Sequence, residues 1–434
     1  MVIKGGSKEH FVAKEPMSIT AVGIYDISEQ DFETSHFWGK LQHMLIIYYH
    51  YSENHPVSAY RFKDFVMVGY EFHEFSQDDA ETLKTDWEYV RSLCSEVISH
   101  HPGPRDKKWK DAVKEKYIDV HGQLRRVLSY VDLAPKFPPR FRLKQTVVSS
   151  MIAKHFGYSL EQLPGRYVSI SDIDLKCREL TALYSGQTIG ELVSHFNLEL
   201  LTDGKLEIKS VAEKIVIAMF GGTASKLNQI EMFEKFGLIG KTIRLTAQGG
   251  RTEDMKLYHV DFNELIRETV IDEESIERPI TFEDSEMFSY FNGQEFLCIM
   301  FKENPLNAQL EYKVNSLSSN VFVGFKRVVF SDGFIYTKVR RLWEDTRAKI
   351  MGHKLIDVIQ KNREGAPILL KNGEISTAPN FLKASSNDVF LRGSGPASSL
   401  KYKTECVNGI RMLPQYVWIK GTSIIDELNK TPEI

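Results

Sequence analysis

The tetrapeptide Phe32-Glu33-Thr34-Ser35 returns later in the chain as Phe282-Glu283-Asp284-Ser285. In both places an apolar run follows, over residues 44–49 and over residues 296–301. Short apolar runs rich in Ile, Tyr and Phe are typical of buried β-strands. The recurrence therefore predicts one structural unit, a turn followed by a core strand, that is present twice.

Two more landmarks recur in the same order. Trp87-Glu88 lies in a stretch with helical periodicity, residues 79–98, and Trp343-Glu344 lies in a second one, residues 339–360. The third landmark is Phe141-Arg-Leu-Lys144, matched by Val417-Trp-Ile-Lys420, and each predicts the start of a short amphipathic helix. A fixed order of landmarks at comparable spacing is the signature of an internal repeat.

The repeat predicts two domains of one fold, residues 1–165 and residues 184–434, joined near residues 160–183. The first copy has 31 residues between Met1 and Phe32, whereas the second has 98 between Tyr184 and Phe282. The first copy is therefore about 67 residues shorter. We expect it to be incomplete, without the helical layer and first strands of the second, and we expect its first eight residues to be disordered.

Composition sets the broad class of the protein. Of 434 residues, 42% are hydrophobic and 26% are charged, as in ordinary globular domains. No apolar run is long enough to cross a bilayer, and the first residues have no signal-peptide pattern, so we expect a cytoplasmic protein. The four cysteines are widely separated, which disfavours zinc and disulfide frameworks.

A net charge of −3 excludes a general polyanion binder but not local nucleic-acid contacts. The densest basic segment is residues 136–144, which also holds Phe137, Phe141 and two prolines. Cations that reach phosphates, on a stiff loop that approaches base edges, suit groove recognition. We therefore expect DNA contacts from Lys136, Arg140, Arg142 and Lys144.

Two segments of the chain resemble one enzyme family. The stretch Tyr184-Ser-Gly-Gln-Thr-Ile-Gly-Glu-Leu-Val193, together with Gly237-Leu-Ile-Gly-Lys-Thr-Ile243, resembles the start of MutH, the GATC-specific nicking endonuclease of mismatch repair. Residues 11–16 and Phe32-Glu-Thr-Ser-His-Phe-Trp-Gly-Lys40 resemble its middle. Two such units in tandem resemble the GATC-cutting type II restriction endonucleases of the Sau-3A type.

The resemblance implies an α/β fold, a mixed sheet flanked by helices, of the PD-(D/E)xK nuclease type. It implies phosphodiester hydrolysis in which an Asp and a Glu hold Mg²⁺ and a Lys two residues after the Glu assists the attacking water. Carboxylates suit this hard cation, and the bound metal activates water and stabilises charge on the phosphate. The first unit would be catalytic, and the second would bind DNA and regulate.

In the second copy, the family's metal-binding positions hold apolar residues. Ile239 stands at the Glu, Met232 at the Asp and Ile217 at an upstream acid, while Lys241 alone remains. The second copy is therefore predicted to be a pseudo-nuclease that holds no metal. In the first copy the motif is expected to lie before residue 1, since Val2-Ile3-Lys4 has a Lys but no Glu.

The resemblance also assigns roles within the first copy. Lys40 matches a basic residue beside the scissile phosphate, and Glu33, Ser35 and His36 would support that region. Taken as a residue type alone, Lys40 is an ordinary surface lysine ahead of a strand.

The family resemblance also indicates which residues would read the DNA bases. Ala134-Pro135-Lys136 matches the loop that reads bases, because Lys suits the two acceptors of guanine. Arg142 replaces an aromatic residue that contacts adenine, which leaves sensing of adenine methylation open. In the second copy Arg392 and Lys420 take the corresponding places, and we expect Trp418 to pack in the core.

Three functions remain open from the sequence. The chain is a GATC endonuclease of which a catalytic segment is missing, a non-cutting protein that binds GATC in double-stranded DNA and could self-associate there, or a protein-interaction module that kept the fold. Because the carboxylates are not seen, enzyme activity is left undecided, and Mg²⁺ is expected only for the complete family site.

Overall fold

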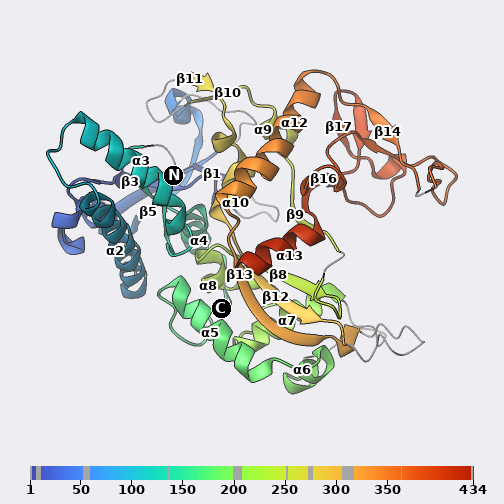
Figure 1. The fold of residues 1–434 in the computed structure, drawn as a ribbon, viewed down its shortest axis with the longest axis horizontal. Coiled ribbons are helices and arrows are strands. Elements are labelled where there is room, and N and C mark those ends of the chain that lie inside the picture. The colour runs from blue at the N-terminus through green and yellow to red at the C-terminus, as the bar shows by residue number, and fades with distance from the viewer. Residues whose placement is uncertain are drawn as a thin grey trace.

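The computed structural model describes residues 2–5, 11–51, 59–134, 137–198, 208–250, 253–271, 277–304, 317–362, 364–431 and 434. It is a mixed α/β structure in which the first and second halves of the chain lie side by side (Figure 1). Within the described part of the chain, no helix is both long and apolar enough to cross a membrane.

The described residues of the first half form two sheets and four α-helices. One sheet has the order β2-β1-β4-β5, and the other has the order β3-β7-β6. The strands are β1 (Val2–Gly5), β2 (Phe11–Ala13), β3 (Met17–Ala21), β4 (Met44–His50), β5 (Val66–His73), β6 (Val131–Leu133) and β7 (Arg140–Leu143). The helices are α1 (His36–Leu41), α2 (Gln77–Ser99), α3 (Lys107–Leu124) and α4 (Gln145–His155).

A helical layer follows this unit in the chain and packs on α4 and on the strands of the second half. It consists of α5 (Ile170–Tyr184), α6 (Ile189–His195), α7 (Ile208–Met219) and α8 (Glu231–Lys235). Helix α5 begins well before Tyr184, where the sequence pattern starts the second domain. It is set by a capping box at Ser169, whose side chain accepts a hydrogen bond from the backbone of Asp172.

The second half repeats the two-sheet arrangement, with the orders β13-β12-β8 and β16-β19-β9. Its main strands are β8 (Leu238–Leu245), β9 (Met255–His259), β12 (Glu295–Lys302), β13 (Val321–Val328), β16 (Val389–Gly393) and β19 (Gln415–Ile419). Short hairpins join β10 (Thr269–Ile271) to β11 (Glu277–Pro279), β14 (Asp357–Ile359) to β15 (Thr377–Pro379) and β17 (Glu405–Val407) to β18 (Ile410–Met412). The helices are α9 (Phe262–Leu265), α10 (Glu286–Gly293), α11 (Asp332–Phe334), α12 (Arg340–Met351) and α13 (Gly421–Lys430).

The three sequence landmarks occupy matching places in the two halves. Ser35 and Ser285 each cap a helix, α1 and α10, with the hydroxyl oxygen accepting from a backbone N–H three residues on. Each hydroxyl also donates to the carbonyl of the preceding phenylalanine. This explains why the Phe-Glu-x-Ser pattern recurs, since it builds the same turn ahead of the same strand.

The sheets recur with the same pairing. Strand β12 pairs in parallel with β8 and antiparallel with β13, as β4 does with β1 and β5. In the small sheets Leu143 faces Met17 and Val131, as Ile419 faces Met255 and Val389. The predicted match of Phe141–Lys144 with Val417–Lys420 is confirmed by this register.

Two details differ from the sequence predictions. The helix expected to run to Gln360 ends at Met351, and residues 357–359 form β14. At the start of the chain, Val2–Gly5 form strand β1, although we expected these residues to be disordered. Tertiary pairing with β4 supplies the backbone hydrogen bonds that this short segment could not make by itself.

The two faces of β12 belong to different cores. Leu297, Ile299 and Phe301 pack into the core formed with the helical layer and the first half. Phe296, Cys298 and Met300 face the core of the second half, which includes α12 and α13. Alternation along one fully buried strand therefore joins the two halves into one packed body.

Candidate nucleic-acid interface and degenerate metal site

In the second half, apolar residues hold the positions that the family resemblance assigns to metal ligands. Met232 lies in the first turn of α8 and is buried. Ile239 lies on β8, two residues before Lys241. Thioether and aliphatic groups offer no oxygen ligand to Mg²⁺. The described part of the chain also contains no group of three or more His, Cys, Asp or Glu side chains placed to hold a metal ion.

The acidic neighbours of Met232 are used elsewhere. Glu231 forms an ion pair with Lys235 at 2.8 Å, and Lys235 in turn pairs with Asp79 of the first half at 3.0 Å. Glu234 is largely buried, and burial raises the pKa of its carboxyl group. Neither carboxylate replaces the missing ligands, so the residues at this site do not fit a Mg²⁺ ion.

Lys241 is held as a structural residue. Its Nζ donates to the backbone carbonyl of Lys256 at 3.2 Å, which ties β8 to β9. Burial lowers the pKa of the Lys241 ammonium group. The lysine of the degenerate motif therefore joins the large sheet to the small one.

Strand β1 of the first half does not restore the motif. It pairs in parallel only with the last residues of β4, Val2 with Tyr49 and Ile3 with His50. Strand β8 instead pairs along the whole of β12, so that Lys241 faces Cys298 near its start. Lys4 therefore does not occupy the position of Lys241.

The outer face of the small sheet in the second half carries cations over aromatic rings. Lys256 on β9 places its Nζ 3.4 Å from the ring centroid of Tyr416 and donates to the Ser394 hydroxyl at 2.9 Å. Such cation–π contacts hold the ammonium group in place while leaving it charged. The alternation of β19 puts Val417 and Ile419 into the core and leaves Tyr416 and Trp418 on this outer face.

Arg392 stands on the same face. Its guanidinium lies 5.0 Å from the ring of Trp418 and 4.8 Å from that of Phe390, and it pairs with Asp254 at 2.7 Å. About 46% of its side chain is exposed, so the charge remains accessible. We call Lys256, Arg392, Tyr416 and Trp418 the cationic face.

Trp418 was expected in the core and is not there. Its ring is half-buried beneath Arg392, and its Nε1 donates to the Arg392 carbonyl at 3.2 Å. The other two members that sequence reasoning missed are Lys256 and Tyr416. The alternation Tyr416-Val-Trp418-Ile predicts that the two aromatic rings share a face of the strand. The sequence does not show which cations lie over these rings, because Lys256 and Arg392 come from other strands.

The equivalent face of the first half is turned toward the second half. Arg142 pairs with Asp132 across β7 and β6. Both side chains line a cavity of about 90 Å³ between the halves, which Arg125, Glu283 and Glu295 also line. Arg140 is half-buried at the other end of β7. The residues of the first half that the sequence predicts to contact DNA therefore do not lie together on one exposed surface.

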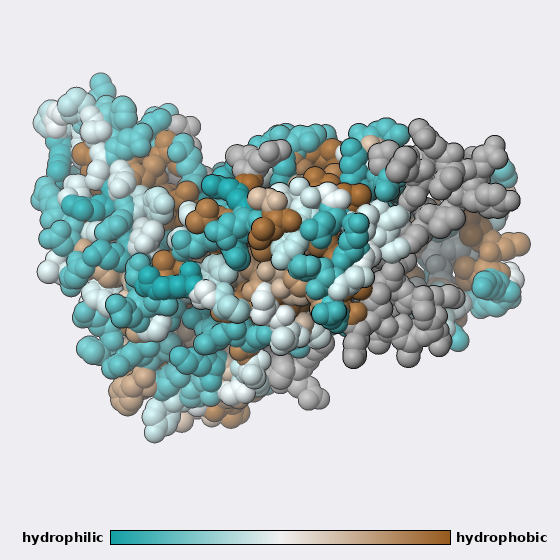
Figure 2. All heavy atoms as spheres, turned by 90° about the horizontal axis from the view of Figure 1, so that it is seen from below, coloured by the Kyte–Doolittle hydropathy of each residue, from teal (hydrophilic) through white to brown (hydrophobic). Residues whose placement is uncertain are grey.

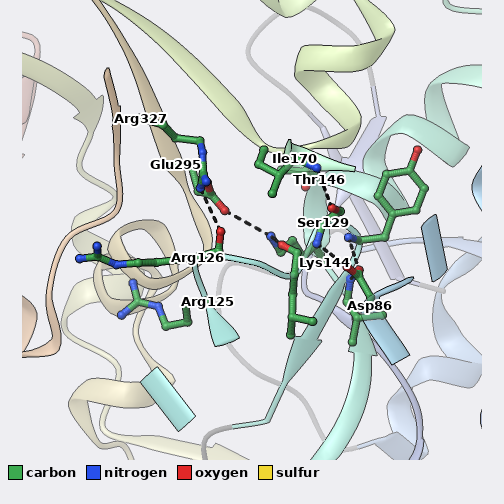
Figure 3. Close-up of polar contacts among 12 residues, drawn as sticks. Asp86, Arg125, Arg126, Ser129, Lys144, Thr146, Ile170, Glu295 and Arg327 are labelled. Atoms are coloured by element: carbon green, nitrogen blue, oxygen red, sulfur yellow. Dashed lines mark hydrogen bonds and ion pairs between the residues drawn. The ribbon is translucent and has the colours of Figure 1, made fainter. Parts of the chain in front are cut away.

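Lys144, which the sequence assigns to DNA contact, is buried in the structure. Only about 10% of its side chain is exposed, and its Nζ donates to the Leu128 carbonyl at 2.6 Å. The same ammonium group lies 3.6 Å from Glu295 of the second half, as the dashed lines of Figure 3 show. Lys144 therefore stabilises the contact between the halves.

Glu295 is the centre of that contact (Figure 3). This buried carboxylate also pairs with Arg327 at 2.6 Å, and Arg327 is paired with Asp174 on α5 at 2.8 Å. Arg327 donates in addition to the Arg126 carbonyl of the first half. The four charged groups fix the helical layer, the first half and β12 to one another.

The remaining predicted residues are dispersed. Lys40 is exposed near the end of α1 and donates to the Ile19 carbonyl at 3.1 Å, and His36 is exposed at the start of the same helix. Glu33 pairs with Lys84 at 2.7 Å, which lowers the pKa of its carboxyl group. Ser35 is the helix cap described above. Lys420 is half-buried ahead of α13, and Lys136 lies outside the described residues.

Comparison with known proteins finds two similarities. The family profile described as "DNA mismatch repair enzyme MutH" matches residues 3–86. The type II restriction enzyme Sau3AI of Staphylococcus aureus is 20% identical over 413 residues, which covers 92% of this chain and 78% of that enzyme. With the mixed α/β fold and the repeated landmarks, these matches make the chain a MutH-like relative of the type II restriction endonucleases.

Proposed function

We propose that this chain binds GATC sites in double-stranded DNA through the cationic face of its second half, and that the second half does not hydrolyse DNA. The observation that carries the proposal is the combination of a cationic face, whose Arg392 is exposed and whose other members are half-buried, with apolar residues at the nearby positions that the family resemblance assigns to metal ligands. Lys241, the lysine of the degenerate motif, donates to the backbone carbonyl of Lys256, whose side chain belongs to that face. The proposed DNA-binding face therefore lies beside the motif at which the metal-binding carboxylates are replaced by apolar residues.

The chemistry of this face suits duplex DNA. An arginine is the commonest reader of guanine, because its two donors match the O6 and N7 acceptors in the major groove. Lysines on the same surface contribute phosphate contacts that do not depend on sequence. MutH-like endonucleases generally use Mg²⁺, and here Ile239 and Met232 stand where carboxylates would bind it, so the second half serves for binding alone.

Binding is measured by fluorescence anisotropy with a labelled duplex that contains one GATC site and a matched duplex with that site scrambled. We expect binding to the GATC duplex to be at least tenfold tighter than to the scrambled duplex. The affinity should also fall steeply as the salt concentration rises, because each phosphate contact releases counterions from the DNA. Binding to the duplex should not require Mg²⁺. Equal affinity for both duplexes would contradict GATC recognition, and the absence of any salt-dependent binding would favour the protein-interaction alternative.

A further inference from the structure

Hydrophilic side chains cover most of the molecular face seen in Figure 2, so an exposed cation is not by itself a sign of recognition. Arg392 differs from an ordinary surface arginine because its guanidinium is held from several sides. The ring centroids of Phe390 and Trp418 lie 4.8 Å and 5.0 Å from its Cζ, and Asp254 accepts a hydrogen bond from its Nη2 at 2.7 Å. The rings hold the guanidinium from below, and Asp254 holds it from the side.

The ion pair between Asp254 and Arg392 spans the central strand of the small sheet. Arg392 lies on β16 and Asp254 directly precedes β9, and β19 runs between these two strands. The backbone of Arg392 stands opposite Tyr416, yet its guanidinium lies over Trp418, two residues further along β19. Asp254 therefore draws the arginine diagonally across the sheet, and the ring of Tyr416 is left to Lys256.

Asp254 is itself held in place. Its Oδ2 accepts from Arg392, and its Oδ1 accepts the backbone N–H of Gly421, the first residue of α13, at 3.1 Å. Only about 17% of its side chain is exposed. A carboxylate that is anchored to the backbone in this way gives the arginine a fixed acceptor.

The internal repeat shows that the shared fold does not require this pair. By the register of the small sheets, Pro16 stands in the first half where Asp254 stands in the second, and Ala134 stands where Arg392 does. Both partners are replaced together, although α4 follows its strand in the first half as α13 does in the second. The acid therefore accompanies the arginine and is not a requirement of the fold.

The pair leaves the arginine able to bind a base. The hydrogen bond to Asp254 uses one N–H of Nη2, so the second N–H of Nη2 and those of Nη1 remain for a base edge. Two such donors match the O6 and N7 acceptors of guanine. An arginine that is already held loses little side-chain freedom on binding, whereas a free one can reach the phosphates of any sequence.

We infer that Asp254 is a positioning residue that gives the cationic face its sequence specificity. It holds the Arg392 guanidinium in the orientation that reads a guanine of the GATC site. Its negative charge also disfavours contacts of the arginine with phosphates, which every sequence offers. This inference rests on the proposed DNA binding and adds the residue on which discrimination between sequences depends.

Asp254→Asn separates the two contacts of the carboxylate. The amide oxygen can still accept the Gly421 N–H, while the amide NH₂ cannot accept from Arg392, so we expect the Tm to stay within about 3 °C. Anisotropy titrations with the GATC duplex and the scrambled duplex measure discrimination. We expect the ratio of the two affinities to fall about tenfold, because the bidentate contact with guanine is no longer preset. The affinity for the scrambled duplex should not fall, since the change removes a negative charge near the phosphates.

Two controls separate positioning from a general effect of charge. Glu253→Gln removes the same charge one residue earlier, from a side chain that pairs with Arg244, and should leave the ratio within about twofold. In an Arg392→Ala background, Asp254→Asn should cause no further fall in the ratio. A positioning residue acts only through the group that it holds, so the two changes are not additive.

Failure of this inference can be told apart from failure of the proposed function. If the unchanged chain binds both duplexes equally, GATC recognition fails and the inference fails with it. If the unchanged chain discriminates and Asp254→Asn discriminates as well, only the positioning role is overturned. An equal loss of affinity for both duplexes, or a further fall of the ratio in the Arg392→Ala background, would also overturn it.

Discussion

Replacing Asp86 with alanine is expected to lower the free energy of unfolding by about 3–5 kcal/mol, measured from urea denaturation curves. Asp86 is completely buried on α2, and its carboxylate accepts backbone N–H groups from Ser129, Tyr130 and Val131 at 2.6–2.8 Å. Figure 3 shows the carboxylate beneath the start of β6. The substitution leaves three buried donors without an acceptor at the junction of a helix and a sheet.

Asp78→Ala is the matched control for this change. Asp78 lies on the same helix, but its ion pair with Arg166 is exposed, so we expect a loss below about 1 kcal/mol. Asp86→Asn should fall between the two, because the amide retains one acceptor oxygen. If Asp86→Ala cost no more than Asp78→Ala, the buried carboxylate would not anchor β6.

The second large effect is expected on DNA binding. We expect the double variant Lys256→Ala, Arg392→Ala to bind the GATC duplex about 100-fold more weakly than the unchanged chain, because each cation contributes about 1–3 kcal/mol to DNA contact. The slope of log K against log salt should become shallower by about one to two. Anisotropy titrations at several salt concentrations measure both quantities.

Arg340→Ala provides the control for that measurement. Arg340 is an exposed arginine in an ion pair with Glu344, as Arg392 is with Asp254, but it lies on α12 away from the small sheet. Its loss should leave the affinity within about twofold. An unchanged affinity of the double variant, with its Tm preserved, would remove the cationic face from the proposed interface.

The repeat was readable from the sequence because its landmarks carry local structure. The Phe-Glu-x-Ser turn is fixed by a serine that accepts a hydrogen bond from the backbone three residues on, and the apolar runs predict the strands β4 and β12. Such local rules act identically in both halves. They explain why the order of elements, and the register of β7 with β19, follow from the sequence.

The placement of single charged residues did not follow, because it is decided by contacts between the halves. Lys144 and Lys420 occupy equivalent positions, yet Lys144 is buried against Glu295, a residue 151 positions away in the chain. Trp418 looked like a core residue, since sequence alone does not reveal that Arg392 covers its ring. Tertiary context therefore sets which basic residues are free to meet DNA.

Incubation of the chain with unmethylated plasmid DNA and Mg²⁺ tests the central claim, that this chain binds DNA at GATC sites and that its second half does not hydrolyse it. The account predicts that a plasmid with several GATC sites is retarded on a gel but remains supercoiled. Failure to retard the plasmid would contradict it, whereas conversion to nicked circles or to fragments with GATC ends would mean that the protein has a metal site away from Met232 and Ile239, whose side chains provide no metal ligand.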